Sequence, residues 1–289
     1  MTLIKELRQH IVDNWSDYLA TTKKNCESYH ESMTVENHQA HNEDPDYHKF
    51  ILGPISKKPE YWEGKKALDF GCGCGRNIKN LLETAEWERV DGCDISKKNA
   101  DYTKKYVSQF FAPERCKTWE TDGYSLSTDV ENEYDYVMSH IVFQHIANWY
   151  MRYSILSDMY KVLKPGGLLS IHFMDLSGAA AYHGNHPPPN KTLPEFLEEC
   201  KEQKFLNVVD PSFLNDRGEL TEAESMEELT YWFKKTFGEG EEWQPINCQV
   251  EDPKYIADDL YAIGFKMVGI ETVIDPYAKV KAYYIGALK

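Results

Sequence analysis

The segment ALDFGCGCGRNIKN, residues 67–80, constrains the fold of this chain more than any other segment does. An apolar run ends there at three closely spaced glycines, and residues with helical spacing follow at once. Glycine has no side chain and tolerates positive φ, so such a turn bends tightly and lets the backbone approach a ligand. The segment therefore predicts a strand, a glycine turn and a helix, with a ligand at the turn.

Short apolar runs alternate with helical spacing up to residue 173, and the alternation resumes after residue 250. Strands separated by helices of this length form βαβ units, which predicts an α/β fold with a parallel sheet and helices on both faces. The last two strands are joined too closely for a helical crossover, so we expect them to pair antiparallel. The predicted strands are 66–70, 88–96, 117–123, 134–140, 168–173, 266–274 and 280–289.

The same pattern divides the chain into three parts. We expect an N-terminal helical or lid segment at 1–60, a core at 61–175 and 251–289, and an acidic inserted cap at 176–250. Between residues 195 and 252 there are 16 acidic and 5 basic residues, a net −11 of the chain's −15. Aromatic residues in that stretch favour a packed cap over the open end of the sheet, and a solvated insertion is the alternative.

Composition limits the function classes. A net charge of −15 argues against a general affinity for nucleic acids or anionic membranes, because phosphate binding requires lysine and arginine. No apolar run approaches the length of a membrane span, and no signal-peptide core is evident. The seven cysteines are odd in number and contain no CxxC pair, which predicts reduced thiols, a cytoplasmic location and no metal site. The oligomeric state stays open.

The spacing of the glycines limits the ligand. A dinucleotide fingerprint needs G-x-G-x-x-G, but here the third glycine comes one residue early and Arg76 takes its place, and no Gly-Lys-Ser/Thr follows for a P-loop. The next predicted strand ends in Asp94, which can accept hydrogen bonds from both ribose hydroxyls and would repel a 2′-phosphate. Asp122, at the end of the third strand, can accept from an adenine amine. This combination fits an adenosine with free ribose hydroxyls, while simple helix caps are the alternative for both carboxylates.

The stretches ALDFGCGCGR, VDGCDIS, TDG, YDYVMSHIVFQHI and VLKPGG, in this order, resemble the class I, Rossmann-like, S-adenosylmethionine-dependent methyltransferases. The resemblance implies a seven-stranded, mostly parallel sheet whose last strand is antiparallel. It implies S-adenosyl-L-methionine as cofactor and S-adenosyl-L-homocysteine as product. The implied cofactor-binding residues are Asp69, Gly71, Cys72, Gly73, Gly75, Asn77, Asp94, Ile95, Asp122, Gly123, Ser139 and Gln144.

The resemblance also assigns roles to these residues. Gly71, Cys72 and Gly73 would border the methionine moiety, and Ser139 would lie under the sulfonium end. Asp94 would contact the ribose, Ile95 the adenine face and Asp122 the adenine edge. Asp69 would orient either the loop or the amino group of the ligand, and a purely loop-bracing role is the alternative.

Methyl transfer from a sulfonium is an in-line displacement, so the enzyme mainly aligns the reactants. An oxygen or nitrogen acceptor must also lose a proton, which a general base promotes. His145 is the first candidate for this base and His140 the second, and a histidine that only shapes the pocket is the alternative reading for His145. We expect the acceptor pocket to form from residues 1–60 and 174–250.

The predicted function is methyl transfer to an oxygen or nitrogen of a small molecule. A peptide or protein acceptor and a non-catalytic module that binds an adenosyl ligand remain alternatives. A nucleic-acid methyltransferase is disfavoured because the fourth strand ends in SHIV where an Asn/Asp-Pro-Pro-aromatic motif is typical. A nicotinamide-dependent reductase is disfavoured by Arg76. No nucleic-acid or membrane partner is expected.

Overall fold

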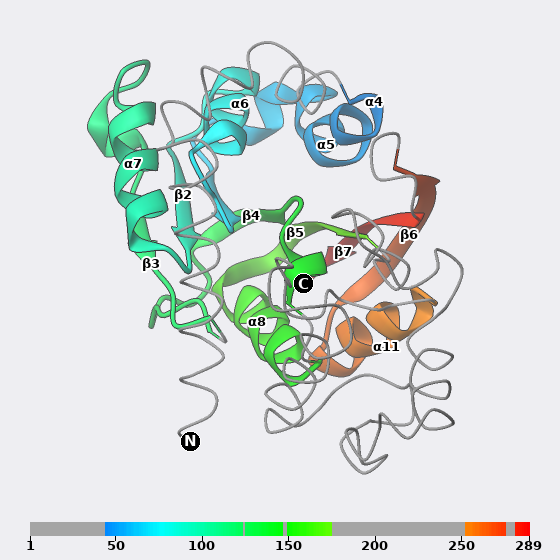
Figure 1. The fold of residues 1–289 in the computed structure, drawn as a ribbon. Coiled ribbons are helices and arrows are strands. Elements are labelled where there is room, and N and C mark those ends of the chain that lie inside the picture. Colours follow the sequence, from blue (N-terminus) through cyan, green and yellow to red (C-terminus); the bar gives the residue numbers. More distant parts are fainter. Residues whose placement is uncertain (1–43, 124, 147–148, 175–251, 276–280) are drawn as a thin grey trace.

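The computed structural model describes residues 44–123, 125–146, 149–174, 252–275 and 281–289 (Figure 1). The predicted acidic cap and the first 43 residues of the predicted lid lie outside the described residues. Helical turns precede the sheet at α4 (Pro45–Tyr47), η1 (His48–Leu52), α5 (Gly53–Ser56) and η2 (Pro59–Trp62). The strands are β1 (Lys66–Phe70), β2 (Arg89–Asp94), β3 (Thr118–Glu120), β4 (Tyr134–Ser139), β5 (Leu163–Met174), β6 (Lys266–Ile274) and β7 (Lys281–Leu288). The helices between them are α6 (Arg76–Thr84), α7 (Lys97–Val107), η3 (Pro113–Arg115), η4 (Phe143–His145), α8 (Trp149–Val162) and α11 (Lys254–Ile263).

The described strands form one sheet in the order β3-β2-β1-β4-β5-β7-β6. The first five strands are parallel to one another, and β7 runs antiparallel to both β5 and β6. The predicted fold class, a seven-stranded, mostly parallel sheet with an antiparallel last strand, is therefore confirmed. The antiparallel pairing predicted for the two closing strands is confirmed as well.

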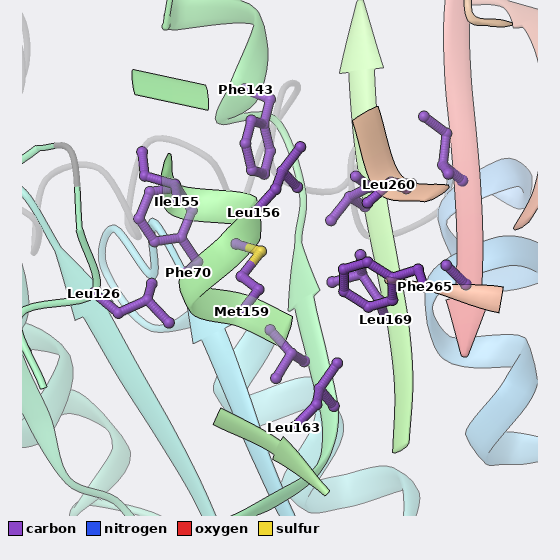
Figure 2. Close-up of a cluster of buried hydrophobic side chains, with 14 of the residues drawn as sticks. Phe70, Leu126, Phe143, Ile155, Leu156, Met159, Leu163, Leu169, Leu260 and Phe265 are labelled. Atoms are coloured by element: carbon purple, nitrogen blue, oxygen red, sulfur yellow. The ribbon is translucent and has the colours of Figure 1, made fainter. Parts of the chain in front are cut away.

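Helices cover both faces of the sheet (Figure 1). On one face, α4, η1, α5, α6 and α7 pack over a core that includes Ile51, Ile78, Trp87, Val107 and Tyr136. On the other face, α8 and α11 pack over a second core, and Figure 2 shows Met159 of α8 with Phe70 of β1, Leu169 of β5 and Phe265. Complete burial of both faces explains why the central strands have nearly continuous apolar runs.

Two strand boundaries differ from the sequence prediction by more than two residues. The prediction started the fifth strand at residue 168, but β5 begins at Leu163, because the register with β4 jumps from Tyr134↔Leu163 to Tyr136↔Leu168 and the KPGG residues bulge out between them. The third strand was predicted to end at residue 123 and ends at Glu120, where the chain enters a turn. Neither difference moves the carboxyl ends of β1, β2 and β4, which carry the site.

A buried ion pair holds β2 to its neighbours. Asp91, almost fully buried in β2, accepts hydrogen bonds from the Arg89 Nε, from the Tyr134 hydroxyl and from the Lys117 backbone N–H, each at 2.8 Å. Burial and the Asp91 charge both raise the pKa of Tyr134, so its hydroxyl stays protonated and donates. This carboxylate joins β2, β4 and the start of β3.

We predict that Asp91→Ala lowers the free energy of unfolding by about 3–5 kcal/mol, because it leaves the Arg89 Nε and the Tyr134 hydroxyl without their shared partner, while Arg89 keeps its pair with Glu133. Urea unfolding followed by circular dichroism measures the change. The control is Asp101→Ala, which removes an exposed pair with Lys97 and should cost less than about 0.5 kcal/mol. Equal losses for the two variants would contradict the role of Asp91.

Candidate functional site

The order of the strands locates the site before any side chain is considered. The chain leaves β1 for a helix on one face and leaves β4 for a helix on the other, although the two strands are neighbours. In open α/β sheets, ligands bind outside the carboxyl ends of the strands where the connections diverge in this way. We call the carboxyl ends of β1 and β4 the switch point. The residues predicted to bind the cofactor follow β1, β2, β3 and β4 at this edge.

The glycine loop, Gly71–Gly75, is fixed to the end of β2. The backbone N–H groups of Gly71 and Cys72 both donate to the Cys93 carbonyl, at 2.8 and 3.0 Å. A Cβ on Gly92 would lie 3.0 Å from the Cys72 sulfur, so the Cys72 side chain packs directly on β2 where there is no side chain. This packing draws the loop toward β2.

Gly73 is held on both sides. Its N–H donates to Asp94 Oδ2 at 2.9 Å, and its carbonyl accepts from the Thr103 hydroxyl of α7 at 2.7 Å. Yet a Cβ built on Gly73, at φ +52°, would meet nothing within 4 Å. The loop backbone is thus held by Asp94 and Thr103 and is open on the side where a side chain would point. A ligand that binds against the backbone requires such an open side.

Gly71 has the opposite surroundings. Its φ is +74°, and a Cβ there would lie 2.3 Å from Val142 Cγ2 in the segment after β4. Gly75, at φ +89°, begins α6 and faces Thr103. The glycines therefore serve three different purposes: close approach to the segment after β4, an open cradle, and the helix start.

Asp94 ends β2 and is almost fully buried. Besides the bond from Gly73, its Oδ1 accepts from Ser96 N at 2.9 Å and from Asn99 Nδ2 at 3.2 Å. Burial raises its pKa, and these hydrogen bonds oppose the shift. A carboxylate offers about four lone-pair positions, and three are used here, so Asp94 has room for one ribose hydroxyl without losing a partner. A contact to both hydroxyls would displace one of the three.

The residues predicted for the adenine lie in the adjoining turns. Asp122 accepts from the Ser125 backbone N–H at 2.7 Å and from the Ser125 hydroxyl at 2.8 Å, so it also caps a turn. Gly123 is buried at φ +87°, and Ile95, directly after β2, is half-buried. Their contacts with an adenine stay a prediction.

Three buried polar atoms of two side chains flank the switch point without a hydrogen-bond partner among the described residues. Both carboxylate oxygens of Asp69, in β1, lack a partner, and so does the Gln144 Oε1, in η4 after β4. Asp69 is 0% and Gln144 1% exposed. Burial raises the pKa of Asp69 to about 8, and the nearby Asn77 amide and Arg76 guanidinium oppose that shift. An unpaired buried polar group costs about 1–3 kcal/mol, so two at one edge indicate that a ligand supplies the partners.

The remaining predicted residues have mixed outcomes. Ser139 donates to the Phe70 carbonyl at 2.9 Å and so ties the end of β4 to the end of β1. Asn77 lies in the first turn of α6, where its Oδ1 accepts from the Tyr47 hydroxyl at 3.1 Å. The backbone of His145 ends η4, but its side chain lies outside the described part of the chain. Its role as a base stays a prediction.

The sequence prediction named His140 as the second base candidate but missed the polar cluster that surrounds it beside the switch point. His140, directly after β4, lies with its ring centroid 4.7 Å from Tyr47 of α4 and 4.8 Å from His172 of β5. His172 in turn pairs in register with Tyr284 of β7. Arg76, the first residue of α6, donates from Nη2 to His140 Nδ1 at 3.1 Å. These residues are far apart in the sequence, so no local motif contains them. The signal in the sequence for His172 and Tyr284 is the alternation of polar and apolar residues along β5 and β7.

Burial disfavours the reactive thiolate form of the two free cysteines near the loop. Cys72 and Cys93 are free and buried, and burial raises the pKa of both thiols well above their usual range. Cys74 is disulfide-bonded. The prediction that every cysteine is a reduced thiol is therefore wrong for Cys74.

A cavity of about 340 Å³ opens at the opposite edge of the sheet, where β4 and β5 begin. It is lined by Tyr61, Trp62, Lys65, Asp135, the residues 164–168 and Leu288. Because it faces the amino ends of the parallel strands, it is separate from the switch point. Within the described residues, no helix is long and apolar enough to cross a membrane.

Comparisons with known proteins agree with this geometry. Residues 67–167 match the family model described as a methyltransferase domain. An uncharacterized protein of Rickettsia prowazekii is 29% identical over 137 residues, which cover 46% of this chain and 52% of that protein. The match thus spans about half the length of this curated relative.

Solved structures show the same fold. The Burkholderia thailandensis 1,6-didemethyltoxoflavin-N1-methyltransferase, with its substrate and S-adenosylhomocysteine, superposes with a TM-score of 0.53 at 16% identity, covering 98% of this chain and 87% of that one. The Haemonchus contortus phosphoethanolamine N-methyltransferase 2, with S-adenosyl-L-methionine, gives 0.53 at 14% identity, covering 95% and 60%.

The family model identifies residues 67–167 of this chain as a methyltransferase domain, and the strand order agrees with a Rossmann-like fold. The enzyme class predicted from the sequence, and S-adenosylmethionine as its cofactor, are thereby confirmed for the matched domain.

We predict that Gly71→Ala destabilises the protein more than Gly166→Ala does. Both glycines have φ near +75°, so both alanines carry the same backbone strain of about 1–2 kcal/mol, but a Cβ on Gly166 meets nothing within 4 Å. The clash with Val142 should add about 1–3 kcal/mol at Gly71 alone. Urea unfolding measures both variants, and Gly71→Ala in a Val142→Ala background should recover part of the difference. Equal costs at the two glycines would refute the contact.

Proposed function

We propose that this protein transfers the methyl group of S-adenosylmethionine to an oxygen or nitrogen atom of a small molecule. The observation that carries the proposal is the set of buried oxygens without partners, both of Asp69 in β1 and the Oε1 of Gln144 after β4, together with the braced glycine loop that follows β1. The charge of the chain, which disfavours polyanionic acceptors, and the two small-molecule methyltransferases of the same fold support the choice of acceptor.

The residues present fit this cofactor. A carboxylate that is buried and unpaired, as Asp69 is, gains most from a cationic donor such as the ammonium group of the methionine moiety. The open side of Gly73 admits that moiety against the backbone, and the remaining lone pair of Asp94 Oδ2 accepts one ribose hydroxyl. The cofactor supplies an activated methyl group and a neutral thioether leaving group.

The protein's own contribution is then alignment and proton removal. The glycine loop, Asp69 and Asp94 fix the donor at the carboxyl ends of β1 and β2. A neutral oxygen or nitrogen acceptor gives up its proton to a base, and His145, at the end of η4, is the side chain we assign to it. Gln144, its neighbour, supplies a carbonyl that can accept a hydrogen bond from the acceptor.

A nitrogen acceptor has one further argument, because both related structures named above are N-methyltransferases by description. A peptide acceptor finds support in the acidic stretch between residues 195 and 252, which would attract a basic partner.

We propose a cytoplasmic location because the thiols of Cys72, Cys93 and Cys116 are free. The disulfide of Cys74 is the one observation on the described residues that opposes this location.

The first test is binding of S-adenosylhomocysteine, measured by calorimetry against NAD as the control nucleotide. We predict that S-adenosylhomocysteine binds and that NAD does not. Its affinity should rise between pH 6 and 8, because Asp69, whose pKa is raised to about 8, must lose its proton to pair with an ammonium group. Asp69→Asn should lower the affinity about tenfold at pH 8 and remove the rise. NAD binding, or no binding of either compound, would refute the proposal.

The pH dependence of stability gives Asp69 a second readout. A carboxyl group whose folded pKa lies above its unfolded value stabilises the fold below about pH 4, and this stabilisation is lost as the pH rises toward 8. In the absence of ligand, the unfolding free energy should therefore fall over that range in the wild type and less in Asp69→Asn. Parallel curves would show that Asp69 titrates normally.

The base is tested by turnover. We predict that His145→Ala lowers methyl transfer at least about tenfold, while S-adenosylhomocysteine affinity stays within a factor of about three. The assay uses the first acceptor that a panel of small phenols, carboxylic acids and amines provides. Unchanged turnover would remove His145 from the mechanism, and the absence of any product despite tight binding would favour the non-catalytic module.

A further inference from the structure

Arg76 occupies a central position that the proposed function does not yet use. It is the first residue of α6, directly after the glycine loop, and its guanidinium lies 5.4 Å from the centre of the Tyr47 ring. Its Nη2 donates to His140 Nδ1 at 3.1 Å and its Nε to Asn77 Oδ1 at 3.3 Å. Its charge also acts on the buried Asp69. One side chain thus contacts α4, α6 and the residue after β4, and its charge reaches β1.

The bond to His140 fixes the state of that imidazole. A guanidinium only donates hydrogen bonds, so Nδ1 of His140 must be the acceptor and the ring is neutral with its proton on Nε2. The single ring nitrogen able to accept a proton is therefore occupied. A positive charge at this distance also opposes protonation of the ring. In this arrangement His140 does not act as a base.

The methionine end of the proposed donor offers Arg76 a stronger partner. That end carries a carboxylate beside the ammonium group for which Asp69 is suited. A guanidinium binds a carboxylate through paired, charge-assisted hydrogen bonds, which are about twice as strong as a bond to a neutral acceptor. The first turn of α6, which Arg76 begins without a side-chain cap, adds a favourable dipole for a negative charge.

We propose that Arg76 couples donor binding to the state of His140: the guanidinium moves its hydrogen bond from His140 Nδ1 to the donor carboxylate and frees the imidazole to accept a proton. The inference rests on the proposed function, since it needs a donor with an amino-acid end. It makes His140 a second base beside His145, one that can take up a proton at Nδ1 only in the loaded enzyme.

Other groups around the ring keep its surroundings constant in this change. Tyr47 of α4 covers one side, His172 of β5 lies 4.8 Å away and Tyr284 of β7 lies 6.2 Å away, centroid to centroid. His172 accepts at its own Nδ1 from the Ile141 N–H at 3.4 Å. Burial raises the pKa of Tyr47 to about 12 and that of Tyr284 further, so both stay neutral near pH 7. The nearby carboxylates are Asp69 and, around Tyr284, Asp44, Asp46 and Asp275.

The experiment is an NMR titration of the full chain with isotope-labelled histidine, in which the His140 signal is assigned from His140→Gln. Spectra are recorded for the free protein, with S-adenosylhomocysteine, and with 5′-methylthioadenosine, which lacks the amino-acid end. We expect S-adenosylhomocysteine to move the His140 titration midpoint upward by about one pH unit, because a neighbouring positive charge is withdrawn. The methylthio compound should leave it unchanged.

Variants separate charge from geometry. In Arg76→Gln the titration midpoint of His140 should already be high in the free protein, and S-adenosylhomocysteine should no longer shift it. The variant should also bind S-adenosylhomocysteine about tenfold more weakly than the wild type. The affinity for 5′-methylthioadenosine should stay the same. Lys79→Gln removes a positive charge one turn further along α6, where Lys79 pairs with Glu83, and should behave as the wild type.

The outcomes distinguish this inference from the proposed function. If S-adenosylhomocysteine does not bind, the proposed function fails. If it binds but the His140 midpoint stays in place, or moves equally with the methylthio compound, the proposed function stands and the coupling through Arg76 is refuted.

Discussion

The structure of the site depends on how the glycine loop is tied to the end of β2. Two N–H groups of the loop share the Cys93 carbonyl, and a third donates to Asp94. These bonds hold the loop beside the edge of the sheet before any ligand arrives, and the absence of a side chain at Gly92 lets Cys72 pack closely there. Because the loop is fixed in advance, little conformational entropy is lost when a ligand binds to it.

The sequence predicted the fold well because its main signals are local. Apolar runs followed by helical spacing mark βαβ units, and the glycines mark the joint after the first strand. The predicted start of the fifth strand failed because the KPGG run resembles a helix stop and a turn, whereas its position is decided by pairing with β4. Pairing between strands far apart in sequence leaves no local trace.

The same distinction separates the predicted part of the site from the missed part. Asp69, Asp94 and the glycines are placed by the strand that each of them ends or follows, so a motif suffices to find them. The cluster of Arg76, His140 and His172 depends on which strands are neighbours and which faces they share. Alternation alone would assign a histidine inside an apolar strand to the core, and burial is indeed what His172 shows. His172 lies near the switch point because β5 is the neighbour of β4 in the sheet.

Under the proposed function, Asp94 would combine the bracing of this loop with ligand binding. The carboxylate holds Gly73, Ser96 and Asn99 at once, and a ribose hydroxyl would share Oδ2 with the Gly73 N–H. The helix-cap reading and the ribose reading of this residue are therefore compatible, because the cap bonds leave one lone pair for the ligand. Losing this carboxylate would release the loop and remove a ligand contact together. Donor affinity and loop order must then change in parallel when Asp94 is altered, whereas at Asp69, which braces no described residue, affinity can change alone.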